Sequence, residues 1–225
     1  MRARVFVWLG GGLFVASLSL CAWTYLVVLG RSAPAAGWRP MAVNAALITV
    51  FALHHSLFAR DRLKAWLTRS IPASLLRSVY VWVASLLLML VCALWRPIGG
   101  ELYRVTGFAA VALAAVQLAG VWITARGVAR IDPLELAGIR PASASQGLQV
   151  TGPFRWVRHP LYLGWVLMVF GAAHMTGDRL AFAVITTIYL VVAIPWEERS
   201  LLKIFGEEYT RYMRNVTWRM IPFIY

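Results

Sequence analysis

Charged residues are scarce in this sequence. Only 14% of its 225 residues are Asp, Glu, Lys or Arg, against about 25% in a typical soluble domain. Hydrophobic residues make up 60% of the chain, which is more apolar surface than one soluble domain of this size can bury. The composition therefore excludes an ordinary soluble protein and predicts that lipid surrounds most of the chain.

Cysteine is equally rare, and neither copy suggests chemistry. Cys21 and Cys92 both lie inside apolar runs, without the spacing of a metal or redox motif. His54 and His55 are adjacent near the end of an apolar run, but no third ligand at a suitable spacing accompanies them. The sequence therefore predicts packing roles for these residues and no metal site.

Acidic residues are the rarest ionisable groups. There are nine of them against 22 Lys and Arg residues, which gives a net charge of +13. A basic balance can indicate nucleic-acid binding, but the basic residues here cluster between apolar runs, as in loops held at an anionic membrane surface. We therefore expect membrane lipid as the partner of this charge, and not nucleic acid.

Long apolar runs are abundant. A transmembrane helix needs about 20 largely apolar residues, and six runs approach this length: 5–29, 41–59, 75–95, 105–125, 160–176 and 180–196. The fifth run is short, so it either tilts or forms a tight hairpin with the sixth through Thr176-Gly177-Asp178. The sequence thus predicts an all-α polytopic transmembrane helix bundle of about six spans, the last two forming a hairpin.

The first run could instead be a signal peptide. Arg2 and Arg4 precede it, and Ala33-Pro34-Ala35 resembles a cleavage site. However, signal cores usually contain about 7–15 residues, and this run is far longer. We therefore expect it to be a transmembrane helix.

Basic residues are distributed unevenly between the ends of the spans. One side carries only Arg31, Arg39, Arg96, Arg104 and Arg179, and the other side carries all the remaining Lys and Arg residues. Because these residues are enriched on the cytoplasmic side, we expect both termini in the cytoplasm, as for a protein of a bacterial inner membrane. An even number of spans, or a re-entrant final hairpin, satisfies this orientation.

The longest polar stretch, 126–158, suggests a functional boundary. We expect residues 1–125 to form N-terminal transmembrane helices. Residues 126–225 would then contain a cytoplasmic loop, the helical hairpin and a C-terminal amphipathic helix, and would carry the chemistry.

The densest polar motif covers residues 146–164. Gly152-Pro153 predicts a turn, and Pro160 suits the first turn of a helix, where no amide donor is needed. Arg158 and His159 are then expected at the start of the fifth span, where free helix amides suit a carboxylate or a ribose. A simpler alternative is that the arginines of this motif only anchor the span at the membrane interface.

Four of the nine acidic residues gather near the C-terminus, as Glu197, Glu198, Glu207 and Glu208. The first two directly follow the sixth apolar run, where acids are costly unless they are solvated or partnered. Tyr209 and Tyr212 follow at a spacing of three, which predicts one face of an amphipathic helix. The simpler alternative for the acids is weak pairing with the neighbouring basic residues, Arg199 and Lys203.

Both motifs are expected on the same side of the membrane, at the two ends of one hairpin. They carry opposite charge, and His159 and Tyr162 share a helix face because they are three residues apart. A zwitterionic cofactor with an amino group, a carboxylate, a ribose and a sulfonium would match such a site.

The two motifs resemble the isoprenylcysteine carboxyl methyltransferase superfamily, which includes phospholipid methyltransferases, methanethiol S-methyltransferases and NnrU-like proteins. The strings are Gly152-Pro-Phe-Arg-Trp-Val-Arg-His-Pro-Leu-Tyr-Leu-Gly164 and Glu197-Glu-Arg-Ser-Leu-Leu-Lys-Ile-Phe-Gly-Glu-Glu-Tyr-Thr-Arg-Tyr212. Looser similarity in the first half is closest to the methanethiol S-methyltransferase and NnrU-like branch, at residues 55–60, 64–66, 77–80 and 95–98.

The resemblance implies S-adenosylmethionine as the cofactor. By position it implies these cofactor contacts: Gln146, Gly147, Leu148, Gln149, Phe154, His159, Pro160, Leu161, Tyr162, Glu197 and Glu198. Arg158 and His159 are the candidate catalytic residues, and either Arg158 or Arg155 is the cation expected to lower the pKa of an acceptor thiol. Phe154 replaces the Tyr common in the family, and Ala193 replaces an Arg that helps the isoprenylcysteine enzymes to hold their substrate.

These features favour a membrane methyltransferase that methylates a small or lipophilic thiol. A carboxyl methyltransferase of the isoprenylcysteine type and a phospholipid methyltransferase are the alternatives within the superfamily. A non-enzymatic NnrU-like membrane protein is the alternative from another class. Transport is disfavoured, because the predicted spans are nearly free of ionisable residues.

Overall fold

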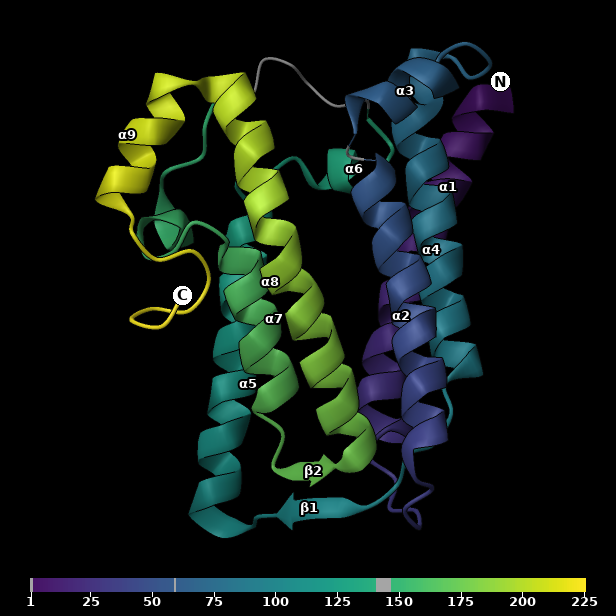
Figure 1. Ribbon diagram of the computed structural model, residues 1–225, viewed down its shortest axis with the longest axis vertical. Coiled ribbons are helices and arrows are strands. Elements are labelled where there is room, and N and C mark those ends of the chain that lie inside the picture. Colours follow the sequence, from purple (N-terminus) through teal and green to yellow (C-terminus); the bar gives the residue numbers. More distant parts are fainter. Residues whose placement is uncertain (1, 59, 141–146) are drawn as a thin grey trace. The chain divides into compact units, whose positions relative to one another are not determined.

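The computed structural model describes residues 2–58, 60–140 and 147–225, and it is built almost entirely of helices (Figure 1). The two strands in the described ranges are β1 (Glu101–Arg104) and β2 (His174–Thr176), which pair with each other. Five of the helices are long and apolar enough to cross a membrane. The prediction of an all-α polytopic membrane bundle is therefore confirmed.

The described residues form two compact units. The first unit contains residues 2–58, 60–101, 132–140 and 176–178, and the second contains residues 102–131, 147–175 and 179–225. The expected functional boundary at residue 125 remains a prediction, because the two units are defined by packing and not by function. In particular, the fourth apolar run packs with the C-terminal half of the chain.

The first unit is a set of long helices. Its elements are α1 (Arg2–Trp23), η1 (Thr24–Val28), α2 (Trp38–Phe58), α3 (Asp61–Leu67), η2 (Ala73–Leu75), α4 (Leu76–Leu94) and α6 (Pro133–Leu136). Both α1 and α2 pack against α4. Gly10 allows α1 to approach the Trp82 ring of α4, whose Nε1 donates to the Phe6 carbonyl oxygen at 3.1 Å. The short helix α6 is held by Ser78, whose hydroxyl donates to the Gly138 carbonyl oxygen at 2.5 Å.

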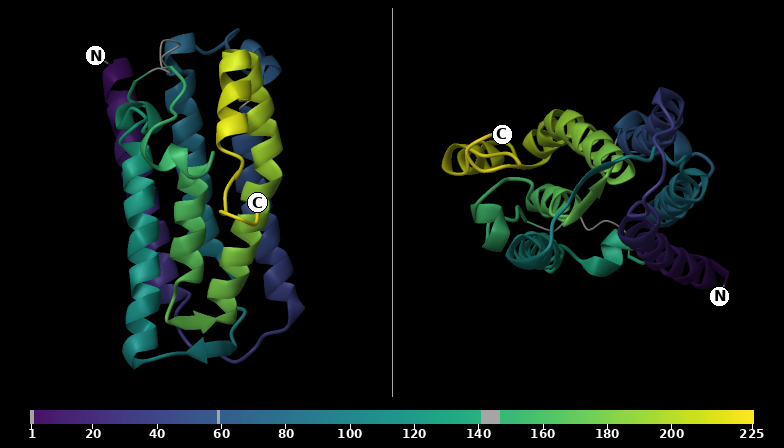
Figure 2. Two further views of the ribbon diagram at one scale, coloured as in Figure 1. Left: turned by 90° about the vertical axis from the view of Figure 1, so that its left-hand side faces the viewer. Right: turned by 90° about the horizontal axis from the view of Figure 1, so that it is seen from below.

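The second unit carries the predicted site. Its elements are α5 (Gly107–Val128), η3 (Gly152–Arg155), α7 (Pro160–Phe170), nearly all of α8 (Gly177–Phe205), and α9 (Glu207–Asn215). Figure 2 shows α5, α7 and α8 running alongside one another. Glycines let α5 and α7 touch through their backbones: a Cβ added at Gly164 would lie 2.7 Å from the Gly120 carbonyl oxygen. Trp165 of α7 reaches α8, where its Nε1 donates to the Thr186 hydroxyl at 3.0 Å.

The last two apolar runs differ from their predicted bounds. The run at 160–176 becomes the 11-residue helix α7 followed by β2. At 1.5 Å per residue such a helix is about 16 Å long, roughly half of the hydrocarbon core of a bilayer. The next helix, α8, is longer than predicted, with 29 residues. Six complete crossings therefore remain a prediction.

The length of α8 corrects the expected position of the acidic pair. Glu197 and Glu198 do not follow the end of a helix but lie within α8, which continues to Phe205. Gly206, with φ of 52°, then separates α8 from α9. Glu197 thus faces the same way as the helical residues one and two turns later, Leu201 and Phe205.

Candidate functional site

The first wall of the site is built by a turn that leads into α7. Gly152 adopts a positive φ of 63°, and Pro153 occupies the first turn of η3. His159 precedes α7 as its N-cap residue, and Pro160 is the first residue of the helix. The predicted helix start at Pro160 is therefore confirmed, and Arg158 and His159 directly precede the helix.

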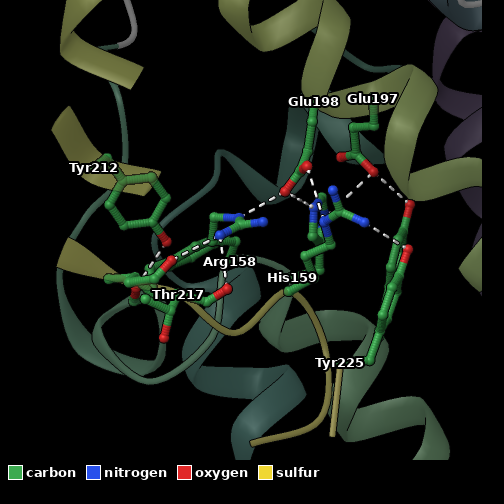
Figure 3. Close-up of polar contacts among 11 residues, drawn as sticks. Arg158, His159, Glu197, Glu198, Tyr212, Thr217 and Tyr225 are labelled. Carbon is green, nitrogen blue, oxygen red and sulfur yellow. Dashed lines mark hydrogen bonds and ion pairs between the residues drawn. The ribbon is translucent and has the colours of Figure 1, made fainter. Parts of the chain in front are cut away.

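The second wall is the C-terminal segment, which binds the backbone of the same two residues. The Arg158 amide donates to the Trp218 carbonyl oxygen at 2.9 Å, and the His159 amide donates to that of Arg219 at 2.8 Å. Arg158 Nη1 also donates to the carbonyl oxygens of Val216, at 2.8 Å, and Thr217, at 2.9 Å (Figure 3). No sequence pattern predicted this segment, because backbone carbonyls are present in every residue.

Glu198 is the centre of a buried ionic network. Its carboxylate accepts from Arg158 Nε at 2.6 Å and lies 3.2 Å from Arg219 Nε and 3.5 Å from His159 Nε2 (Figure 3). The side chains of Arg158 and Glu198 are each only 7% exposed. Glu198 therefore pairs with Arg158 of the basic motif and Arg219 of the C-terminal segment. The alternative of weak pairing with its sequence neighbours, Arg199 and Lys203, does not describe this acid.

Glu197 differs from its neighbour, because its side chain is 46% exposed. It accepts a hydrogen bond of 2.8 Å from the Tyr162 hydroxyl and lies 3.5 Å from His159 Nδ1. The rings of His159 and Tyr162 stack at a centroid distance of 5.3 Å, which confirms that they share one face. His159 is thus held between two carboxylates, one buried and one open to solvent.

The two carboxylates favour the protonated form of His159. Burial disfavours its protonated form, but hydrogen bonds and charge attraction from Glu197 and Glu198 outweigh burial and raise the pKa of the imidazole. Arg219 is held in turn by Tyr225, whose hydroxyl accepts from Arg219 Nη1 at 3.1 Å. The network therefore concentrates positive charge around the two acids.

Arg158, His159, Tyr162 and Glu197 line a cavity of about 250 Å³. Of the residues predicted as catalytic or cofactor-binding, it is lined by Gly147, Leu148, Gln149, Phe154, Arg158, His159, Pro160, Leu161, Tyr162 and Glu197. Glu198 does not line the cavity and acts on it through Arg158 and His159, while Gln146 lies outside the described residues. The two motifs, far apart in the sequence, thus form one hollow.

Five lining residues were not predicted as site residues: Ile131, Leu201, Phe205, Tyr209 and Tyr212. The spacing of four from Glu197 to Leu201, and again from Leu201 to Phe205, could have indicated a common helix face, had the full length of α8 been predicted. Tyr212 lies in α9, and its hydroxyl donates to the Phe154 carbonyl oxygen at 2.7 Å. Through this bond α9 holds the turn η3 against the cavity.

Arg155 does not join the site. It lines a separate open hollow of about 440 Å³ together with Trp122, Arg126 and Trp156. The rings of Trp122 and Trp156 stack at 6.0 Å, and the Arg126 guanidinium lies 5.8 Å from the Trp122 ring. Arrangements of Trp and Arg at helix ends are typical of interfacial anchors, so the anchoring alternative suits Arg155 and not Arg158.

Comparison with known proteins finds methyltransferases among the relatives of this chain. The phospholipid methyltransferase family matches residues 108–208. Methanethiol S-methyltransferase 2 of Bradyrhizobium diazoefficiens is 37% identical, over 77% of this chain and 70% of that relative. The methanethiol S-methyltransferases of Crocosphaera subtropica and Mycobacterium tuberculosis are 38% and 37% identical, over 81% and 78% of this chain and 74% and 75% of their own lengths. No solved structure gives a significant match.

The region matched by the family contains all the lining residues of the cavity except Tyr209 and Tyr212. Residues 108–208 run from α5 to the start of α9 and include both the basic motif and the acidic pair. Identity to the relatives extends over three quarters or more of the chain. The chain therefore belongs to the family of the methanethiol S-methyltransferases, and it is an integral membrane methyltransferase.

Proposed function

We propose that this protein transfers a methyl group from S-adenosylmethionine to a small thiol such as methanethiol. The observation that carries the proposal is the single cavity lined by both motifs, with the Glu198 network behind it. The names of the relatives support a thiol as the methyl acceptor. Ala193, at the position where isoprenylcysteine enzymes carry a substrate-holding Arg, supports a small substrate over a prenylcysteine.

The chemistry of the cavity suits this cofactor. Glu197 offers a partly exposed carboxylate to an ammonium group or to ribose hydroxyls, and Tyr162 orients it. Leu148, Phe154 and Phe205 offer apolar surface to a purine base. We propose that these residues, together with Gly147, Gln149, His159, Pro160 and Leu161, form the cofactor site. When bound, S-adenosylmethionine supplies an electrophilic methyl group on a sulfonium.

We assign different roles to the two candidate catalytic residues. Arg158 lines the cavity, but its guanidinium is engaged by Glu198, Val216 and Thr217. It therefore acts mainly as a positioning residue that joins α8 to the C-terminal segment. The two carboxylates raise the pKa of His159 and so favour its protonated form at the cavity wall, and a cation beside an acceptor thiol favours the thiolate.

Methyl transfer then requires above all that the acceptor sulfur, the methyl carbon and the sulfonium lie in line. The acceptor sulfur forms a bond to the methyl carbon while the bond between that carbon and the sulfonium breaks, and the thiol proton is lost to solvent. The protein contributes by holding both partners in line and by excluding water from them. The apolar lining residues of α8, Leu201 and Phe205, serve this purpose in the proposed site.

We also propose the orientation predicted from the basic residues. Both termini and the cavity would face the cytoplasm of a bacterial inner membrane, because most Lys and Arg residues lie at the corresponding span ends. In the second unit, Arg126, Arg158 and Arg199 lie at the cavity end of α5, α7 and α8, whereas Arg104 and Arg179 lie at the β1 and β2 end.

The test is a methyl-transfer assay with detergent-purified protein and methyl-labelled S-adenosylmethionine. Methanethiol, a prenylcysteine and phosphatidylethanolamine are offered in parallel, and we expect label in volatile dimethyl sulfide. Label in an ester of the prenylcysteine or in the lipid headgroup would replace the thiol by one of the alternative acceptors. Failure of the protein to bind S-adenosylmethionine or its demethylated product would remove the proposed donor.

A further inference from the structure

Tyr209 carries a buried hydroxyl that has no hydrogen-bond partner among the described residues. The residue is only 1% exposed and lines the cavity from α9. Buried tyrosine hydroxyls usually find a partner, because an unpaired polar group that is shut off from water costs free energy. Because Tyr209 is one of the residues that line the cavity, a ligand bound there is the candidate for the missing acceptor.

Tyr212, one turn later on the same helix, shows what a structural tyrosine does here. It is also buried, but its hydroxyl donates to the Phe154 carbonyl oxygen at 2.7 Å. The two rings lie 5.8 Å apart and belong to one apolar cluster with Val216. The two tyrosines thus share one cluster, but only the Tyr212 hydroxyl has a hydrogen-bond partner among the described residues.

The surroundings of Tyr209 keep its hydroxyl a neutral donor. Burial raises the pKa of the phenol, and the negative charge of Glu198 raises it further, while Arg158 acts in the opposite sense. The nearby carboxylate of Glu198 already faces Arg158, Arg219 and His159. The hydroxyl therefore stays protonated, and the carboxylate of Glu198, whose charge acts on it, already has its partners.

We propose that Tyr209 is a ligand-binding residue whose hydroxyl donates a hydrogen bond to an oxygen or nitrogen of the nucleoside methyl donor. This inference rests on the proposed function and adds a contact from α9, which no motif reasoning assigned. A small alkyl thiol offers only a weakly accepting sulfur, so the donor of the methyl group is the better match for this hydroxyl. The hydroxyl of Tyr209 would then donate to an oxygen or nitrogen of either the adenosyl group or the amino-acid part of the methyl donor.

The experiment compares Tyr209→Phe with the matched variant Tyr212→Phe in the full-length protein in detergent. Each removes one hydroxyl from α9. Binding of S-adenosylhomocysteine is measured by calorimetry, and thermal unfolding is measured without ligand. For Tyr209→Phe we expect unchanged or higher thermal stability and a dissociation constant raised about 3- to 10-fold, the value of one neutral hydrogen bond. For Tyr212→Phe we expect lower thermal stability, because a bond within the protein is lost.

Three outcomes would overturn the inference. Unchanged affinity in Tyr209→Phe, with normal binding by the parent protein, removes Tyr209 from the site and leaves the proposed function intact. Lower thermal stability of ligand-free Tyr209→Phe shows that the hydroxyl has a partner inside the protein. Absence of binding by the parent protein itself overturns both this inference and the proposed donor.

Discussion

We expect the same substitution to affect stability at Glu198 and ligand affinity at the adjacent Glu197. Glu198→Gln removes the charge at the centre of a buried network, where the Arg158 and Glu198 side chains are each 7% exposed. Glu197→Gln changes a side chain that is 46% exposed and keeps an oxygen to accept from Tyr162. We expect the first variant to lose stability and the second to lose ligand affinity.

The expected magnitude follows from burial. Removing one partner of a buried ion pair costs about 3–5 kcal/mol, because the other charge stays buried without compensation. Gln still offers an oxygen to Arg158 Nε, and Arg158 keeps the carbonyl oxygens of Val216 and Thr217, so we expect the low end, about 3 kcal/mol. For a chain of this length that corresponds to a melting temperature lower by about 6–12 °C. Glu197→Gln should cost about 0.5 kcal/mol or less, as for exposed pairs.

The assay is fluorescence-monitored thermal unfolding of the ligand-free protein in one detergent, followed by calorimetric binding of S-adenosylhomocysteine. Arg158→Gln and the double variant with Glu198→Gln complete a cycle, and the double variant should lose less than the sum of the single losses. Equal melting temperatures for Glu197→Gln and Glu198→Gln would refute the assignment of one acid to the protein and the other to the ligand. So would unchanged affinity in Glu197→Gln.

Two further predictions concern pH and helix packing. Because the pKa of His159 is raised above its ordinary value of 6.5, its contribution to stability is complete below about pH 6.5 and is lost as pH rises through the raised pKa. Melting temperatures of the parent minus those of His159→Gln should therefore fall across that range, and a difference that grows with pH would contradict the prediction. Gly164→Ala should destabilise the protein by about 1–3 kcal/mol, because its Cβ would lie 2.7 Å from the Gly120 carbonyl oxygen. Gly12→Ala is the control, since a Cβ there meets nothing within 4 Å, and similar losses in the two variants would show that α5 and α7 are not in contact through their backbones.

Much of the helical architecture was predictable because lipid exposure imposes long apolar runs. The helix start at Pro160 was also predictable, since proline suits a first turn. The end of α8 was not: the acidic pair interrupts the hydropathy at 197, yet the helix continues to Phe205. Polar residues end a hydrophobic pattern without ending the hydrogen bonding of a helix, so hydropathy underestimates the length of a helix that continues past its apolar run.

The sequence by itself determined the membrane class, the apolar helices and the two motifs, because composition, run length and local spacing are properties of neighbouring residues. Only the tertiary structure decided which of two adjacent glutamates is buried, and it did so through Arg158 and Arg219, from distant segments. It likewise decided that Tyr212 has a partner and that the hydroxyl of Tyr209 has none among the described residues. Such assignments depend on which chain segments meet in space, and a linear pattern does not carry that information.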